Sequence, residues 1–596
     1  MDEASHNSHD PIYRHLDAYR GSFRLLELCP GKFEDGIECE LLVVDWHDHP
    51  HYESLSYTWG EPPSTRTMTL VGHTMLVGEN LHSALRHLRY PDRARVLWID
   101  ALCINQSDEE EKTRQVGMMR RIYESCSECL IWLGQISMES DNQGSYTVKD
   151  AETAFEIIRL FAAAEPDGDL PANLRSSNAR KGACNAIEGM MFWGNTWWRR
   201  IWTVQEAVIP TRKIITWQTL SISWDVCTQA AENMLNPSMR HYQLIDALSP
   251  EFSWSALNGF ISPMLSLEFT REEALQTPLW TLQRWRHREA TDPRDKVYAL
   301  MGLFQDAHFP SITCDYTLST VAVFKRLTLD LLLLERTLLP LVGLRGEPHA
   351  TAGLPTWVLD MVRPPRPVNS GCKFWEHMDR FHQFHADNNM DLEMETLDDH
   401  SILSLRGLPV DVVLLVDEGI AVDERIILPD EDFIRVVKRR ERISQNHFET
   451  SCHNTAISDS WEHAFWRTML GDVITENELV KRRALGSDQE LFRAFIDNSE
   501  ANEVTESVRS MILNQAFFIT QKGHIGIGPP NTKEGDTVWV LAGGRVPFVL
   551  RPTGNKLSQR QVAGEYMFVG DAFVQGVMDG EFIRNRQDEL QRVLLD

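Results

Sequence analysis

The chain has 596 residues, of which 86 are acidic and 59 basic, so its formal net charge is −27. This length exceeds a single hydrophobic core, and we expect about three domains of roughly 100 to 200 residues each. The acidic balance argues against a general nucleic-acid-binding protein. A local basic cluster, Lys438, Arg439 and Arg440, is interpreted as a solvated helix face.

No segment is expected to enter or cross a membrane. The longest apolar run, residues 327–344, contains the charged residues Asp330, Glu335 and Arg336 within the ~20 residues that a membrane span needs. It therefore predicts a core helix. The N-terminus has no basic start followed by an apolar core, so we expect a cytoplasmic protein.

The cysteines and histidines predict no metal site. Ten cysteines at wide, irregular spacing are expected to be mostly buried thiols. Cys126 and Cys129 form a lone CxxC, without the second ligand pair that zinc would need. The imidazole-rich stretch HDHPH (47–51) contains a proline and precedes a strand, so we interpret it as a loop.

Short strands alternate with helices in the first third of the chain, which is typical of an α/β fold. Strands are expected at 38–46, 52–59, 95–100 and 128–134, and helices at 80–90 and 107–126, the latter with Ser107 as its N-cap. The last three strands are continuously apolar and therefore need cover on both faces. We expect them to be neighbouring central strands of a mainly parallel sheet, which binds ligands at its carboxyl edge, where Asp100 and Gly134 lie.

The rest of the chain suggests two further regions. The α/β domain is expected to span residues 1–225, with an insertion at about 135–183, and to be followed by a mainly helical region at 226–400. Residues 401–596 predict a small β-barrel with a helical insertion at about 430–515. The alternating stretch 401–416 should pair with strands after residue 515, because it should not remain an unpaired edge.

The stretch WWRRIWTVQEAVIP (197–210) predicts a helix with a carboxylate on its apolar side. A repeat of 3.6 residues places Trp198, Trp202, Glu206 and Ile209 on one stripe, while Arg200 and Thr203 point elsewhere. A buried carboxylate is costly unless it is paired, hydrogen-bonded or facing a cleft, so Glu206 is a candidate functional residue. The alternative is an ion pair with a buried arginine such as Arg120 or Arg121.

Four blocks of the sequence resemble, in order, the fungal heterokaryon-incompatibility (HET) domain family. They are YESLSYTWGEP (52–62), LWIDALCINQSDEEEK (97–112), QVGMMRRIYESCSECLIWLG (115–134) and WWRRIWTVQEAV (197–208). The resemblance implies a role in nonself recognition and programmed cell death between fused fungal cells.

The HET family is in turn distantly similar to TIR domains, and LSYTWGE and WTVQE resemble two TIR segments. In catalytic TIR proteins a glutamate cleaves NAD+ between nicotinamide and ribose, and the matching residue here is Glu206. The resemblance thus implies a TIR-like fold with NAD+ as a substrate and no cofactor. The expected substrate-binding residues are Tyr57, Trp59, Gly60, Asp100 and Trp202. Alternative interpretations are a cap or turn role for Asp100 and core packing for the tryptophans.

Three classes of function remain open at this point. The first is an NAD+ glycohydrolase whose activity depletes the cofactor and kills the cell. The second is a non-catalytic recognition module that acts by self-association or by binding an incompatibility partner protein. The third is an accessory domain of a small-molecule pathway. An open cleft that joins Glu206 to Tyr57 and Asp100 would favour the enzyme, whereas a sealed salt bridge would favour the module.

Overall fold

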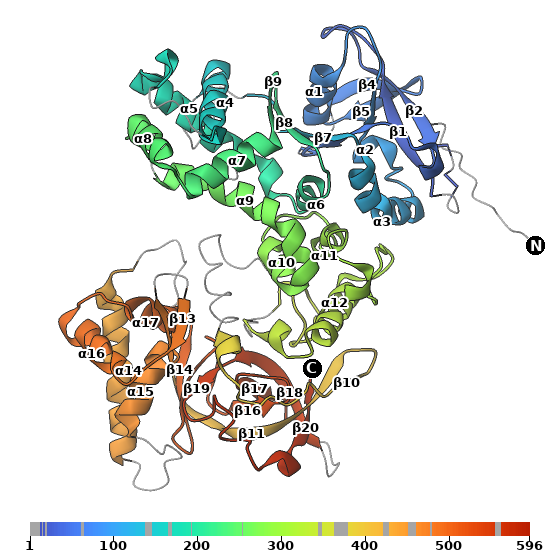
Figure 1. Cartoon of the computed structure of the whole chain (residues 1–596). Coiled ribbons are helices and arrows are strands. Elements are labelled where there is room, and N and C mark those ends of the chain that lie inside the picture. The colour runs from blue at the N-terminus through green and yellow to red at the C-terminus, as the bar shows by residue number, and fades with distance from the viewer. Residues whose placement is uncertain are drawn as a thin grey trace, which may run out of the picture. The chain divides into compact units, whose positions relative to one another are not determined.

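The computed structural model describes residues 12–14, 16–17, 21–60, 65–136, 146–164, 170–191, 194–252, 254–343, 349–362, 380–420, 428–450, 460–476, 480–554 and 562–596. The chain divides into two compact units (Figure 1). The first comprises Met1–Asp306 and Thr313–Thr317, and the second comprises Ala307–Ile312 and Leu318–Asp596. The limits of three domains expected near residues 225 and 400 remain predictions. Within the described ranges, no helix combines the length and the apolar character needed to cross a membrane.

A nine-stranded mixed sheet forms the α/β part of the first unit (Figure 1). The strand order is β5-β4-β2-β1-β6-β3-β7-β8-β9. The strands are β1 (Phe23–Leu28), β2 (Glu38–Val44), β3 (Glu53–Ser56), β4 (Arg66–Leu70), β5 (His73–Val77), β6 (Arg95–Trp98), β7 (Glu128–Trp132), β8 (Lys213–Trp217) and β9 (Leu220–Ser223).

The centre of this sheet confirms the prediction for the three apolar strands. β3 pairs in parallel with β6 on one side and with β7 on the other, and β8 extends the parallel set. Leu97, Ile99 and Ile131 are fully buried, as strands covered on both faces require.

The expectation of a mainly parallel sheet is wrong at the flanks. β1 pairs antiparallel with both β2 and β6, β4 with β5, and β8 with β9. The links at residues 29–37, 71–72 and 218–219 are short, and short links join antiparallel neighbours because a parallel pair needs a long crossover. The sheet is therefore mixed, with a parallel centre.

Helices cover this sheet and continue into a helical region. They are α1 (Glu79–Leu88), α2 (Asp100–Cys103), α3 (Glu109–Ser125), α4 (Val148–Ala162), α5 (Ser177–Met190), α6 (Trp202–Val208), α7 (Trp224–Leu235), α8 (Met239–Leu248), α9 (Trp254–Gln276), α10 (Pro278–Trp285) and α11 (Asp295–Met301). The N-cap of α3 is Asp108, whose side chain accepts from the Glu111 backbone N–H, and not Ser107 as expected.

A buried ion pair fixes α3 to the sheet. The Arg24 guanidinium on β1 donates to both carboxylate oxygens of Glu111, at 2.6 and 2.9 Å. The Arg24 side chain is 1% exposed and that of Glu111 is 6% exposed. Because both charges lie away from water, each depends on the other for compensation.

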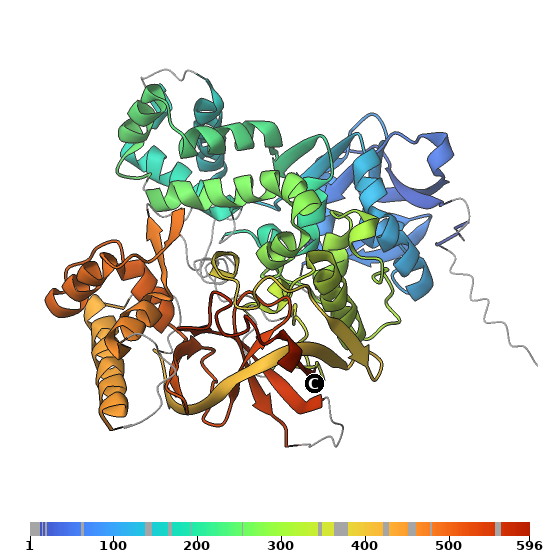
Figure 2. The ribbon, with the colours of Figure 1, turned by 60° about the horizontal axis from the view of Figure 1, so that its bottom comes forward.

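The second unit contains a closed β-barrel, which is seen from another direction in Figure 2. Five strands close it, because β16 pairs both with β17 and with β11. The strands of this unit's main sheet are β10 (Met394–Leu397), β11 (Ile402–Asp417), β14 (Ala516–Thr520), β15 (Ile525–Gly528), β16 (Thr537–Leu541), β17 (Phe548–Pro552), β18 (Val562–Asp571), β19 (Phe573–Val574) and β20 (Gln591–Leu595). β11 pairs with β14, β16 and β20, which confirms that residues 401–416 pair with strands after residue 515.

Helices interrupt the barrel sequence between β11 and β14, as predicted (Figure 1). They are α14 (Asp430–Thr450), α15 (Trp461–Leu470), α16 (Asp488–Asn498) and α17 (Thr505–Ile512), with an unexpected hairpin of β12 (Val473–Glu476) and β13 (Val480–Arg483). A further helix of this unit, α12 (Thr320–Glu335), precedes the barrel.

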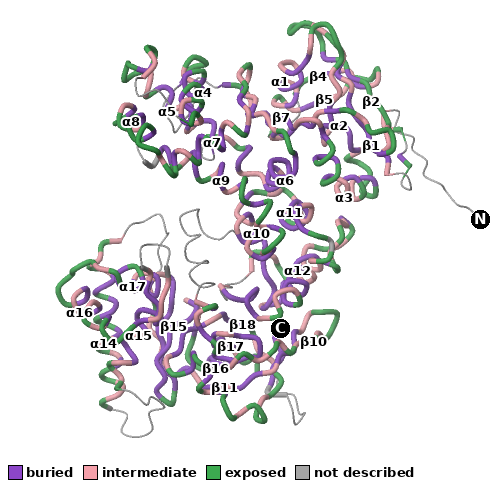
Figure 3. Tube along the Cα trace, viewed as in Figure 1, coloured by how far each residue is buried: buried purple, intermediate pink, exposed green. Residues whose placement is uncertain are grey.

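Arg440 on α14 is fully buried and bonds to Asp417, so the basic cluster is not a wholly solvated face. Figure 3 shows that buried and exposed residues alternate along the inserted helices.

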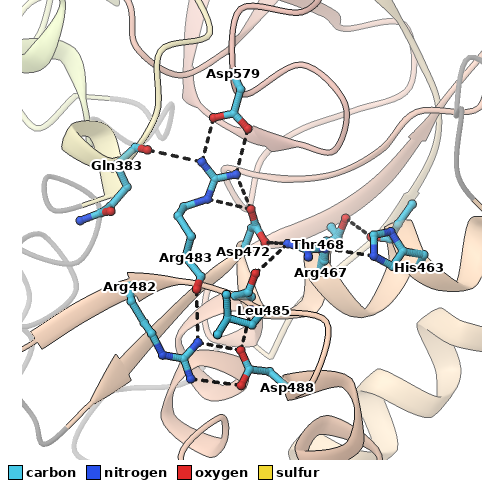
Figure 4. A network of polar contacts seen from close by, with 12 residues as sticks. Gln383, His463, Arg467, Thr468, Asp472, Arg482, Arg483, Leu485, Asp488 and Asp579 are labelled. Atoms are coloured by element: carbon cyan, nitrogen blue, oxygen red, sulfur yellow. Dashed lines mark hydrogen bonds and ion pairs between the residues drawn. The ribbon is translucent and has the colours of Figure 1, made fainter.

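An arginine–aspartate network joins the inserted hairpin to the residues around it (Figure 4). The Asp472 carboxylate accepts hydrogen bonds from Arg467 and Arg483, and its side chain is only 3% exposed. Arg483 also donates to both oxygens of Asp579, at 2.8 and 2.9 Å. One buried carboxylate therefore pairs with two arginines.

Candidate functional site

The helix expected over residues 197–210 is interrupted at Arg200. A 3-10 turn covers Thr196–Arg199, Arg200 forms a β-bridge with Glu289, and α6 begins only at Trp202. The repeat of 3.6 residues therefore does not run through the whole stretch. Thr203, expected to point away from the core, is fully buried, whereas Trp202 is half-buried.

Glu206 lies inside the first unit and is hydrogen-bonded. The Glu206 residue is only 3% exposed. The Ser56 hydroxyl, at the carboxyl end of β3, donates to Glu206 Oε2 at 2.5 Å and accepts from Trp197 Nε1 at 2.8 Å. These two hydrogen bonds join the first HET-like block, 52–62, to the last, 197–208.

The arginines proposed as ion-pair partners have other contacts. Arg120 donates to the Phe304 carbonyl at 2.6 Å, and the Arg121 guanidinium lies over the Trp46 ring, 4.4 Å from its centroid. Glu206 forms no salt bridge with any residue in the described ranges. The cations that act on it electrostatically are Arg200 and Arg288.

Burial raises the pKa of Glu206 to about 7. This value is the net result of burial and the negative charge of Asp100, which raise the pKa, and of Arg200, the Ser56 hydrogen bond and Arg288, which lower it. A carboxyl group with this pKa changes its charge in the neutral range, as catalytic carboxyl groups often do.

Trp59 and Asp100 lie together where β3 and β6 end. The Trp59 indole N–H donates to Asp100 Oδ2 at 2.9 Å, and the Trp59 residue is 43% exposed, so it is not a core tryptophan. Asp100 is the first residue of α2, and its Oδ1 accepts from the Ala101 N–H at 2.7 Å, as the turn interpretation predicts. Gly60 follows with φ of +81°, a left-handed conformation suited to glycine.

Electrostatic interactions connect Asp100, Tyr57 and Glu206. Tyr57 is buried, and burial raises the pKa of its hydroxyl, with further increases from Asp100 and Glu206. Burial also raises the pKa of Asp100, against the lowering effect of Arg200. Arg200 donates to the Tyr57 carbonyl at 2.6 Å, and its guanidinium lies 5.9 Å from the centroid of the Trp59 ring.

Trp202 has a different partner. Its side chain hydrogen-bonds to Asp295 at the start of α11. Burial raises the pKa of the Asp295 carboxyl group, and the hydrogen bond from Trp202 lowers it. Asp295 Oδ1 also accepts from the Tyr316 hydroxyl at 2.7 Å. Asp295 is therefore part of a packed contact between α6 and α11.

Sequence reasoning missed three residues around Glu206: Ser56, Arg200 and Arg288. Ser56 could have been found, because it lies in the LSYTWG block beside Tyr57. Arg288 carries no local signal, since the fold alone brings it to α6. In the part of the chain that the structure describes, no group of three or more His, Cys, Asp or Glu side chains is arranged to hold a metal ion.

Residues 52–206, from the strand that leads to Ser56 through to Glu206, match the family model for heterokaryon incompatibility protein (HET). Residues 492–591 match the model of the Het-6 beta-barrel domain. The chain thus contains a segment that matches the HET family, as the sequence blocks indicated, and a second segment that matches the Het-6 barrel. It is 24% identical to heterokaryon incompatibility protein 6, OR allele, of Neurospora crassa over an alignment of 675 residues that covers 95% of each chain. No solved structure matches the chain.

Proposed function

We propose that the chain is an effector of fungal heterokaryon incompatibility, and that its HET unit kills the cell by cleaving NAD+ with Glu206. The family match and the incompatibility protein of Neurospora crassa support the cellular role. The observation that favours catalysis is the placement of Glu206, a buried carboxyl group held by Ser56 at the end of a parallel strand. Parallel sheets bind ligands at this edge.

The chemistry needs one ionised carboxylate. When the bond between ribose and nicotinamide breaks, positive charge develops on the ribose, and Glu206 would stabilise it. Nicotinamide leaves as a neutral molecule, water supplies the hydroxyl group of the product, and the released proton goes to solvent. Asp100 would bind a ribose hydroxyl, and the exposed Trp59 would stack on an aromatic ring of the substrate.

Glu206 is too buried to touch a substrate in this conformation. Catalysis therefore requires an opening that separates Glu206 from Ser56, and self-association or a partner protein would trigger it. The same burial favours a second candidate function, a recognition module without turnover. In that case Glu206 is a structural residue, and the unit acts through its binding partners alone.

One pair of variants separates the two functions. The full chain is incubated with NAD+ and nicotinamide release is measured, and NAD+ and viability are followed in fungal cells that express it. Glu206→Gln should reduce release by roughly a hundred- to a thousandfold and abolish killing. Glu124→Gln, at an exposed position on α3, is the matched control and should leave both unchanged. Killing by the wild type without any loss of NAD+ would instead establish the recognition module.

A further inference from the structure

Arg288 is a buried cation beside α6 that lies outside the segment matching the HET family. The residue is 1% exposed, and it forms no salt bridge within the described residues. Its Nη1 donates to Thr203 Oγ1 at 2.7 Å and lies 3.4 Å from the Arg200 carbonyl oxygen. Thr203 precedes Glu206 by one helical turn, so Arg288 holds the turn from which Glu206 projects.

The backbone next to Arg288 is attached to the same turn. Glu289 forms a β-bridge with Arg200, and its carbonyl accepts from the Ile201 N–H at 2.9 Å. The Glu289 N–H in turn donates to the Arg199 carbonyl at 2.5 Å. These bonds fix Arg288 relative to α6 independently of its charge.

We infer that Arg288 is a positioning residue for Glu206, which holds α6 and supplies positive charge to the carboxylate from outside the matched HET segment. Ionising a carboxyl group away from water is costly unless cations compensate it. The titratable and charged groups that interact with Glu206 are Asp100, Tyr57, Tyr123, Cys129, Arg200 and Arg288. Among these groups, only the two arginines favour the ionised form of Glu206.

The inference has a kinetic consequence that rests on the proposed function. Burial lowers the pKa of Arg288 to about 9, whereas Glu206 raises it, so the two groups stabilise each other's charge. Without Arg288, Glu206 should ionise at higher pH. Arg288→Met should therefore reduce NAD+ cleavage about tenfold below pH 7, move the acidic limb of the rate profile up by about one pH unit, and keep the plateau above pH 9.

Two further variants serve as controls for Arg288→Met. Arg288→Lys keeps the charge and should restore the acidic limb to within about 0.3 pH units of the wild type. Arg199→Met removes a partly exposed arginine next to the β-bridge residue Arg200 and should leave the limb unchanged. A purely structural role for Arg288 would lower the rate equally at every pH, and this result would overturn the inference.

A stability measurement tests the inference even if the chain does not cleave NAD+. At pH 8, the change in Tm caused by Arg288→Met is compared in the wild type and in Glu206→Gln. We expect the change in Tm caused by Arg288→Met to be more negative in the wild type than in Glu206→Gln, by at least about 3 °C. Only in the wild type does the substitution leave a buried carboxylate without its cation. Equal changes in the two backgrounds would refute the coupling. Absence of NAD+ cleavage together with coupling would refute only the enzymatic function.

Discussion

Replacing Glu206 with glutamine should make the first unit more stable at pH 8, although Glu206 is buried and hydrogen-bonded. Burial raises the pKa of this carboxyl group from 4.5 to about 7. Between these values the folded chain binds a proton that the unfolded chain has released, so stability falls as the pH rises from about 4.5 to 7. Above pH 7 the folded protein carries the full cost of a buried carboxylate.

The size of the effect follows from the two pKa values. At about 1.4 kcal/mol per pKa unit, the gap between 4.5 and about 7 corresponds to about 3 kcal/mol. Glutamine resembles the protonated carboxyl group in shape, and its oxygen still accepts from Ser56. Glu206→Gln should therefore gain about 3 kcal/mol over the wild type at pH 8, or roughly 5 to 10 °C in Tm, and almost nothing at pH 4.5.

Thermal unfolding of both proteins between pH 4.5 and pH 8.5 checks this prediction. The difference between them isolates Glu206 from other carboxyl groups whose pKa burial raises, such as Asp100. It should grow up to about pH 7 and then level off. A variant that melts earlier than the wild type at pH 8, or a difference that does not change with pH, would refute the reasoning. Glu206 would then be a carboxylate that the fold stabilises in its ionised form.

Three further substitutions test other buried polar contacts by thermal or chemical unfolding. Ser56→Ala leaves the Trp197 N–H and a Glu206 oxygen without a partner, and should cost the first unit about 2 to 5 kcal/mol. Glu111→Gln leaves Arg24 uncompensated and should cost about 3 to 5 kcal/mol, whereas Glu110→Gln, on the exposed side of α3, should change stability by less than about 0.5 kcal/mol. Asp472→Asn weakens two charged contacts at once and should cost the second unit about 3 kcal/mol, against about 1 kcal/mol or less for the half-exposed Asp579→Asn. Equal losses within either matched pair would contradict the burial argument.

The sequence predicted those parts of the fold that depend on local pattern. The strands that contain Leu97 and Ile131 are continuously apolar, and this feature alone requires cover on both faces. The pairing of β11 with later strands also followed from its alternation. The parallel centre and the barrel could therefore be predicted before any contact was known.

Other features depend on contacts that no local pattern records. The helix break at Arg200 comes from a β-bridge with Glu289, far along the chain, and overrides the helical repeat of residues 197–210. Arg288 reaches α6 through the same contact. For the site, the sequence indicated Glu206 but could not show that Ser56 holds it, because a hydrogen bond between β3 and α6 exists only after the sheet has formed.

The closed barrel has a consequence for the order of folding. β11 must pair with β16 and with β20, whose residues 591–595 follow it by most of the length of the second unit. During synthesis β11 can pair at first only with β10, through residues 402–405, so the rest of both its edges stays unpaired while the inserted helices emerge and fold. Long-range pairing of this kind is slow, and open strand edges are prone to aggregate. Chains that stop before β20 should accumulate with an open barrel, which makes them natural clients of chaperones.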